Sequence, residues 1–245
     1  MIKKLLPLLL LILIGCSELE PEPINIKTML IQRNDVWYTK DTNQPYSGPV
    51  FSLYDNGQLL EELVLKDGEI HGPYKSYYHY GKLLKNESTY KDGKLDGIWK
   101  VYWEDGQLKE EKTYKDGIEN GLWKKYYESG QLRYEETYKD GKLDGLWKNY
   151  WSNGQLKVER TYKDGKRDGL YKEYYDNGQL SEEKNYKDDE RDGLLKSYYE
   201  NGQLRFEGTY KDDEPDGLWK SYYDNGKLKS ERTYKDGIII DSKKY

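Results

Sequence analysis

The sequence is poor in the residues that most often build disulfides, metal sites and acid-base catalytic sites. Its 245 residues include one cysteine and two histidines. One cysteine excludes an intrachain disulfide, and two histidines leave little material for Cys/His metal sites or histidine catalysis. His71 and His79 lie beside turn signals, with no nucleophile or partner at a fixed spacing. We therefore expect no enzymatic activity, no cofactor and no metal site.

Aliphatic residues are also scarce relative to charge. Hydrophobic and charged residues each make up 35% of the chain, a balance typical of disorder. However, the chain contains 27 tyrosines, 7 tryptophans and 2 phenylalanines, and disordered chains contain few aromatic residues. Because leucine, isoleucine, valine and phenylalanine are too few for a thick core, a two-layer sandwich or doubly wound domain is disfavoured. A thin architecture rich in tyrosine and tryptophan fits better.

No basic region stands out along the chain. Forty basic and 45 acidic residues are interleaved, which gives a formal net charge of −5. A nucleic-acid-binding protein normally shows a clustered basic patch. We therefore expect no nucleic acid partner.

The only cysteine follows a short apolar segment at the N-terminus. Lys3 and Lys4 precede an apolar run from Leu5 to Ile14, and Gly15-Cys16 follows. This order is typical of an export signal, and the run is too short to span a bilayer as a helix. The string Leu-Ile-Gly-Cys resembles the bacterial lipobox. That resemblance implies a signal peptide over residues 1–15 and an acylated Cys16; the alternatives are an ordinary signal peptide or a buried apolar helix.

The resemblance to the lipobox also implies where the mature chain is located. Residues 16–27 would form an acidic, proline-containing spacer between the lipid and the folded part. Acyl chains on Cys16 would hold the protein on a membrane surface. We expect a lipid-anchored protein of the bacterial cell envelope, with the outer membrane or cell surface favoured.

Most of the remaining chain is one tandem repeat. Turn dipeptides ending in glycine recur every 24 or 25 residues, at Gly57, Gly81, Gly106, Gly130, Gly154, Gly178, Gly202 and Gly226. Eight units therefore occupy residues 48–245, preceded by a degenerate capping half-repeat over residues 28–47. A second turn signal, Lys-Asp-Gly, divides most units into two runs of eight to ten residues. Tyrosine, tryptophan and threonine favour strands, and Asn-Gly or Asp-Gly between such runs predicts hairpins.

These signals predict an all-β fold: an elongated, single-layer antiparallel β-hairpin meander of about 16 strands. A two-residue turn at Asn225-Gly226 would pair Lys220 with Glu231, Trp219 with Arg232 and Tyr223 with Leu228. The same register repeats in other units, as Lys100–Glu111, Lys124–Glu135, Lys148–Glu159, Lys172–Glu183 and Lys196–Glu207. Opposite charges across a hairpin specify the alignment of its strands.

Alternation along each strand separates an aromatic face from a lysine–glutamate face. The aromatic face is the candidate binding face, and two interpretations of it stay open: a thin core, or a periodic recognition surface for a protein or a glycan. Its rings could also cage quaternary ammonium groups. The candidate residues are Trp99, Trp103, Trp123, Tyr127, Tyr134, Trp147, Trp151, Val158, Tyr171, Tyr175, Phe206, Trp219 and Tyr223.

Two acidic strings deserve comparison with calcium loops. Residues 188–193 and 212–217 begin like an EF-hand loop, but tyrosines stand at the twelfth positions, 199 and 223, where that loop requires a glutamate. We interpret them as variant hairpin turns.

The repeated unit, such as GLWKSYYDNGKLKSERTYKDG, resembles the MORN repeat and is similar to the variant MORN repeat of bacterial YwqK-type proteins, commonly labelled antitoxins. The resemblance implies an elongated β-hairpin array that binds proteins or, in some members, lipid. We expect an exported, lipid-anchored repeat protein that serves as a protein-binding or scaffolding surface. The alternatives are an antitoxin-like or immunity-like neutraliser of a protein partner, and a glycan- or phospholipid-binding module.

Overall fold

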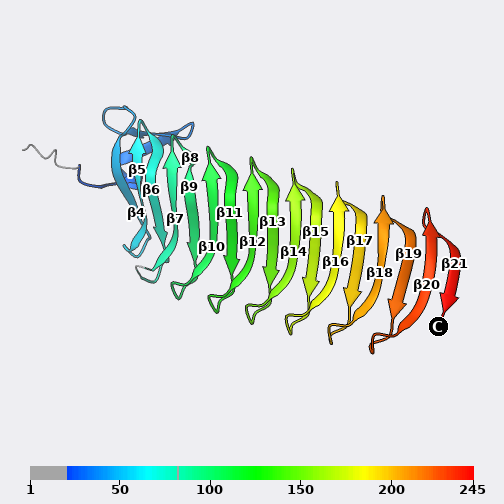
Figure 1. Ribbon diagram of the computed structural model, residues 1–245. Coiled ribbons are helices and arrows are strands. Elements are labelled where there is room, and N and C mark those ends of the chain that lie inside the picture. The colour runs from blue at the N-terminus through cyan, green and yellow to red at the C-terminus, as the bar shows by residue number, and fades with distance from the viewer. Residues whose placement is uncertain (1–20, 82) are drawn as a thin grey trace, which may run out of the picture.

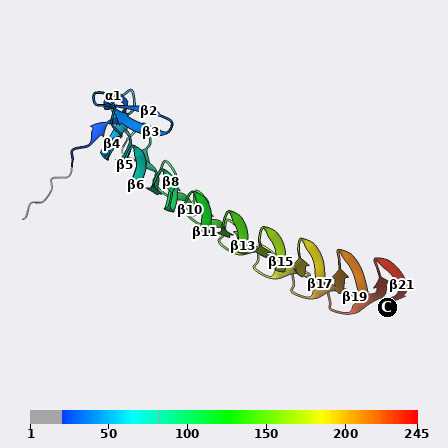
Figure 2. The ribbon, with the colours of Figure 1, turned by 90° about the horizontal axis from the view of Figure 1, so that it is seen from above.

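The computed structural model describes residues 21–81 and 83–245. They form one long, open antiparallel sheet of 19 strands, with a separate two-stranded sheet at its N-terminal end (Figure 1). Seen from above, the hairpins follow one another in a single layer of bowed strands (Figure 2). The all-β, elongated hairpin meander predicted from the sequence is confirmed. The predicted signal peptide and Cys16 lie outside the described residues.

The strands follow the two-run pattern of the repeat. Their bounds are β1 Ile24–Asn25, β2 Leu30–Arg33, β3 Val36–Thr39, β4 Gly48–Leu53, β5 Leu59–Lys66, β6 Glu69–Tyr77, β7 Leu84–Lys91, β8 Lys94–Leu95, β9 Gly97–Tyr102, β10 Leu108–Lys115, β11 Ile118–Tyr126, β12 Leu132–Lys139, β13 Lys142–Tyr150, β14 Leu156–Lys163, β15 Lys166–Tyr174, β16 Leu180–Lys187, β17 Glu190–Tyr198, β18 Leu204–Lys211, β19 Glu214–Tyr222, β20 Leu228–Lys235 and β21 Ile238–Lys244. A short helix, α1, spans Ile26–Met29. The eight units supply sixteen strands, and the sheet gains β1, β21 and the division of one strand into β8 and β9.

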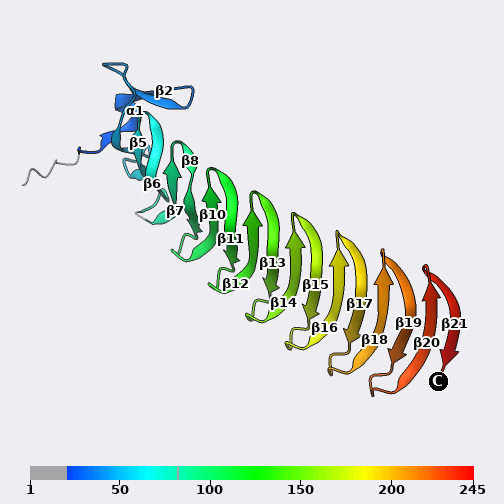
Figure 3. The same cartoon turned by 45° about the horizontal axis from the view of Figure 1, so that its top comes forward.

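From β4 onward the strands pair in chain order, with β8 and β9 both pairing with β7 (Figure 3). The predicted charge pairs are confirmed, because Lys220 lies opposite Glu231 and all five equivalent pairs lie in the same register. The same residues also pair between units, as in Glu207 with Lys220. A continuous row of alternating glutamate and lysine therefore crosses the sheet from Glu62 to Lys243.

The predicted two-residue Asn-Gly turn is wrong. Leu228 pairs with Tyr222 rather than Tyr223, after a register shift. The carbonyl of Tyr223 accepts from the N–H of Gly226 at 2.9 Å, and the N–H of Tyr223 donates to the carbonyl of Lys227 at 2.9 Å. Gly226 has φ +79°. This is the three-residue hairpin loop with a bulge, in which glycine supplies the left-handed residue.

The two-residue turns lie at the opposite edge of the sheet, at Lys-Asp-Gly. Lys115 pairs with Ile118, and both intervening residues, Asp116 and Gly117, have positive φ. Two positive φ values define the type I′ turn, which matches the twist of hairpin strands. The N–H of Gly117 also donates to the carbonyl of Leu95 in the preceding unit, at 2.8 Å. Successive hairpin tips are therefore hydrogen-bonded to one another.

The thickest core lies in the N-terminal cap, which consists of β1, α1, the β2–β3 hairpin and the strands β4 and β5. Its buried residues are each at most 5% exposed: Ile26, Leu30, Val50, Leu63 and Leu65. Strand β1 pairs in parallel with β4, and the β2–β3 hairpin adds Trp37 to the core. Packed structure thus begins at Ile24, inside the segment 16–27 that the sequence predicts as a spacer. Among the described residues, no helix is long and apolar enough to cross a membrane.

Candidate functional site

The aromatic face consists of rings separated by charged or small side chains. From β9 to β20, the middle row of this face reads Trp99, Lys112, Trp123, Glu136, Trp147, Arg160, Tyr171, Lys184, Leu195, Gly208, Trp219 and Arg232. The rings of this row come from the first strand of each hairpin, as predicted. The predicted pairing of Trp219 with Arg232 is one instance of a wider pattern that the sequence analysis did not extend to the other units, in which the second strand places cations, one carboxylate and one glycine between the rings. The sequence signal for this pattern is the equal spacing of Lys112, Glu136 and Arg160, which recur every 24 residues.

These cations lie over the aromatic rings. The ammonium of Lys112 lies 3.8 Å from the centre of the Trp123 ring, and the guanidinium of Arg160 lies 4.7 Å from that of Trp147. Lys184 lies 4.4 Å from the ring of Tyr171. Burial acts to lower the pKa of Lys112, but its hydrogen bond to Glu119 and nearby charges raise it overall. Because the chain's own cations lie over Trp123, Trp147 and Tyr171, these three rings offer little free surface for sugars or quaternary ammonium groups.

A buried carboxylate is fully partnered within the same row. Glu136 is 9% exposed and accepts from the indole N–H of Trp147 at 2.7 Å and from the hydroxyl of Tyr138 at 2.8 Å. A buried carboxylate needs such donors to stay in place. Glu136 therefore fixes the position of Trp147 and belongs to the packing of the face.

A second set of predicted aromatic residues lies at the start of the three-residue hairpin loops: Trp103, Tyr127, Trp151, Tyr175 and Tyr223. The Tyr127 hydroxyl donates to the carbonyl of Tyr150 at 2.9 Å, and that of Tyr175 to the carbonyl of Tyr198 at 2.7 Å. Each bond joins one unit to the next. Tyr127 and Tyr175 therefore hold consecutive units together, and within the set only Tyr223 is exposed, at 42%.

The three variable candidates have different surroundings. Tyr134 packs edge-on against Trp123, with ring centres 5.4 Å apart, and Phe206 stacks near Trp219 at 6.3 Å. Both are half-buried. Val158 is only 6% exposed. Its inclusion as a surface contact is corrected: so little of its side chain is exposed that it is part of the packing of the face.

Tyrosines on the lysine–glutamate face extend the charge row. The Tyr77 hydroxyl donates to Glu62 at 2.6 Å and that of Tyr198 to Glu183 at 3.1 Å; Tyr102, Tyr150 and Tyr222 donate equivalently to Glu87, Glu135 and Glu207. Burial and the adjacent glutamates raise the pKa of Tyr77 and of Tyr198 to about 12. The protonated phenol is therefore part of the folded arrangement.

This arrangement predicts alkaline sensitivity. A phenol with a raised folded pKa stabilises the fold fully below the unfolded value near 10, and that contribution is lost as the pH rises from about 10 to 12. We expect part of the rise in phenolate absorbance at 295 nm to occur only above pH 11, because the tyrosines bonded to glutamates ionise late. The β-sheet dichroism should be lost over the same pH range. Glu62→Gln should bring Tyr77 ionisation closer to pH 10. Ionisation of all tyrosines near pH 10 with the sheet intact would contradict this.

A row of exposed aliphatic side chains on the lysine–glutamate face was missed by the sequence analysis. It contains one residue from each of the last six units, 37–49% exposed: Ile98, Leu122, Leu146, Leu170, Leu194 and Leu218. In the row, Leu146 lies opposite Thr161, and Leu122, Leu194 and Leu218 likewise each lie opposite a threonine. The row spans β9 to β19, about 48 Å at 4.8 Å per strand. Its signal was the fixed position after the strand glycine, as in Gly145-Leu146.

An apolar groove lies on the sheet beside its N-terminal cap. Its volume is about 580 Å³, and its walls include Pro23, Phe51, Leu59, Val64 and Pro73. Lys75 and Glu62, whose charged groups lie 3.9 Å apart, also line it. The groove is therefore suited to an apolar ligand or side chain.

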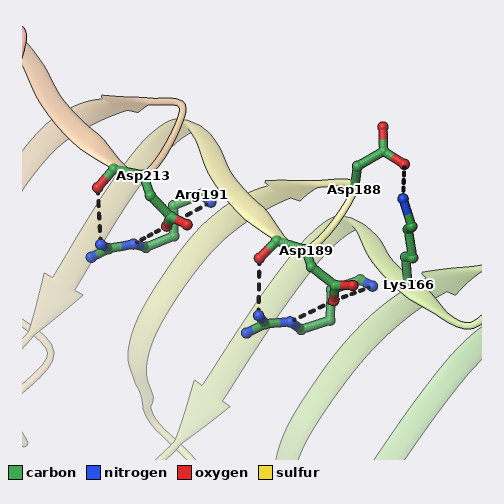
Figure 4. A network of polar contacts seen from close by, with 6 residues as sticks. Lys166, Asp188, Asp189, Arg191 and Asp213 are labelled. Atoms are coloured by element: carbon green, nitrogen blue, oxygen red, sulfur yellow. Dashed lines mark hydrogen bonds and ion pairs between the residues drawn. The ribbon is translucent and has the colours of Figure 1, made fainter.

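The two acidic strings form arginine-bound turns (Figure 4). Asp189 stands where most units have the turn glycine, and its φ is +77°. Its carboxylate accepts from the backbone N–H and the Nε of Arg167 at 3.0 and 3.1 Å, and its carbonyl accepts from the guanidinium at 2.9 Å. These bonds lower the pKa of Asp189. Arg191 binds Asp213 in the same way.

The arginine is expected to compensate for the left-handed aspartate. Where the turn residue is glycine, as at Gly165, the partner position 22 residues earlier is Leu143. Arg167→Leu should lower the melting temperature, because Asp189 keeps an unfavourable φ without its bonds. The double variant Arg167→Leu/Asp189→Gly recreates the Leu143–Gly165 pair and should recover most of the loss in thermal dichroism scans. If the double variant melted at the same temperature as Arg167→Leu, the compensating role of Arg167 would be contradicted.

Comparison with known proteins identifies the repeat. The family described as MORN repeat variant matches residues 95–116, 119–140, 143–164, 167–188, 191–212 and 215–236. No curated protein matches the chain. Among solved structures, one chain of "Crystal Structure of TcdB2-TccC3-Cdc42" aligns at 14% identity and a TM-score of 0.22, over 78% of this chain and 14% of that one. Because the six repeat matches cover more than half of its length, the chain belongs to the MORN repeat variant family.

Proposed function

We propose that the protein is an exported, lipid-anchored scaffold that binds a protein partner at the bacterial cell envelope. The observation that carries the binding role is the row of six exposed aliphatic side chains from Ile98 to Leu218. Apolar side chains repeated along one face at a regular spacing offer a protein partner several apolar contacts to bury. The hydrogen-bonded sheet beneath presents the row on a fixed spacing, so a partner can contact several units at once.

Capture of envelope proteins by the chain tests the binding role. The variant Leu122→Glu/Leu146→Glu/Leu170→Glu places three charges in the row and should retain less than a tenth of the partner captured by the unchanged chain. The matched control, Gln131→Glu/Gln155→Glu/Gln179→Glu, adds the same charge to exposed turn residues of the same region and should capture normally. Equal capture by both variants would overturn the proposal. Relief of a partner's toxicity by the chain would instead assign the neutraliser alternative.

The anchor is tested separately through Cys16. Acylation needs the thiol, so Cys16→Ala should abolish incorporation of a fatty-acid analogue and leave an uncleaved or released precursor. Cys16→Ser is the conservative control and should behave in the same way. Metabolic labelling followed by fractionation of the envelope measures both. Unchanged labelling of either variant would remove the lipid anchor from the proposal.

The apolar groove favours a second candidate function, binding of an acyl chain. Its walls are largely apolar, and Lys75 could pair with a carboxylate or phosphate at its edge. A fluorescent fatty acid should bind the chain saturably, and Val64→Glu should prevent it. Absence of saturable binding would leave the protein-binding function as the sole candidate.

A further inference from the structure

A cleft on the aromatic face distinguishes the last units from the others. It has a volume of about 390 Å³ and lies among β18, β19 and β20. Three rings line it, Phe206, Trp219 and Tyr234, together with Lys229 and Arg232. It lies on the face opposite the exposed aliphatic row, so the two are separate sites.

Gly208 accounts for the position of the Trp219 ring. A Cβ at residue 208 would lie 2.2 Å from ring atoms of Trp219, so only glycine admits the ring there. The φ of Gly208 is not in the left-handed region, so the backbone does not itself require glycine. Trp219 also packs edge-on against Tyr210 and Tyr234, with ring centres 5.1 and 5.8 Å away. The ring is thereby held over Gly208.

Arg232 has a different environment from its counterpart in the middle of the array. Arg160 lies between the rings of Trp147 and Tyr171, at 4.7 and 5.4 Å from their centres. Arg232 has Trp219 on one side in the row, but the residue on its other side is Ser242. It is exposed, and within the part of the chain described here its guanidinium makes no ion pair. A cation therefore faces solvent beside three rings.

The charge of the cleft is also unusual for this chain. Acidic residues outnumber basic ones overall, 45 to 40, yet no aspartate or glutamate lines the cleft. At the equivalent positions two units earlier, Glu173 and Glu182 lie where the cleft has Ser221 and Ser230. The two serine hydroxyls are hydrogen-bonded to each other at 2.7 Å. Replacing carboxylates by hydroxyls removes repulsion toward an anionic ligand.

We propose that this cleft binds an acidic peptide segment carrying an aromatic side chain, supplied by a protein partner. The rings of Phe206, Trp219 and Tyr234 would receive the aromatic side chain, and Lys229 and Arg232 would pair with its flanking carboxylates. Charge complementarity favours a peptide of this kind over a neutral one. The scaffold would then recognise acidic segments of a partner through this cleft, on the face opposite its aliphatic row.

The test uses the probe acetyl-Asp-Glu-Phe-Glu-Asp-amide, with the neutral peptide acetyl-Asn-Gln-Phe-Gln-Asn-amide as its comparison. Titration is followed by the indole N–H signals in nitrogen-15 NMR spectra of the chain. We expect a saturable shift of the Trp219 signal with the acidic probe and at least tenfold weaker binding of the neutral one. Arg232→Gln should weaken binding of the acidic probe at least tenfold.

Two variants make the result specific. Lys157→Gln is the control, because it removes a cation that lies over a ring, Trp151, on β14 and away from the cleft, and it should leave binding unchanged. Ser230→Glu puts a carboxylate into the cleft and should abolish binding while the dichroism spectrum stays that of the unchanged chain. No saturable shift, equal binding of the two peptides, or equal loss in Lys157→Gln would overturn the proposal.

Discussion

Replacing Leu65 with alanine is expected to lower the free energy of unfolding by about 2–5 kcal/mol, the usual cost of a buried leucine-to-alanine change. Leu65 is 1% exposed and belongs to the core of the N-terminal cap, with Val50 and Leu63. The rest of the sheet is one layer thick, so this core is the part of the chain where a cavity removes most packing. Denaturant unfolding followed by tryptophan fluorescence and dichroism measures the change.

Leu146→Ala is the matched control for that experiment. Leu146 is 44% exposed in the aliphatic row, so its replacement should change the unfolding free energy by no more than about 0.5 kcal/mol. The two substitutions remove the same atoms from different surroundings. Similar losses at both positions would contradict the assignment of one as core and the other as free surface.

Deleting half a repeat should disrupt the sheet, whereas deleting a whole repeat should not. Removal of residues 145–168 takes out one complete 24-residue unit and joins Asp144 to Gly169 in an unchanged local sequence. Stability of a repeat array is approximately a sum of unit and neighbour terms, so a folded and slightly less stable protein is expected. The charge row stays in register, because Lys148 and Glu159 leave together.

Removal of residues 145–153 joins Asp144 to Gly154 and deletes most of β13 (Lys142–Tyr150). Strands β12 and β14 run in the same direction in the meander, and parallel strands cannot be joined by a short turn. We expect lost dichroism and broadened NMR signals for this variant. A folded half-unit variant, or an unfolded whole-unit variant, would show that the 24-residue period is not the structural unit.

The sequence was sufficient for the register because opposite charges recur at the same positions in the last six units. Lys148 with Glu159 needs only the alternation of strands and a turn near Asn153-Gly154. The turn type was wrong because Asn-Gly serves both two-residue and bulged loops, and only the hydrogen bond from Tyr223 to Lys227 distinguishes them. The cap could not be predicted, since Ile26 and Leu30 reach their partners in β4 and β5 through contacts far apart in the sequence.

The candidate face was predicted in part. Alternation placed Trp123 and Trp147 on one side of the sheet, but it could not place Lys112 and Arg160 over their rings, because side-chain stacking depends on the neighbouring strand. Burial of Val158 also depends on what covers it. The exposed aliphatic row was overlooked because leucine in a strand is usually read as core, whereas in a one-layer sheet no second layer covers it.

Site-specific photo-crosslinking in the producing cell tests the central claim, that the aliphatic row is where a protein partner binds. A benzophenone amino acid replaces Leu122, Leu146 or Leu170 in the row, and Gln131, Gln155 or Gln179 at the exposed turn edge. We expect one adduct of the same mass from all three row positions and none, or far less, from the turn positions. Adducts of equal yield at both sets, or no protein adduct from the row, would contradict it.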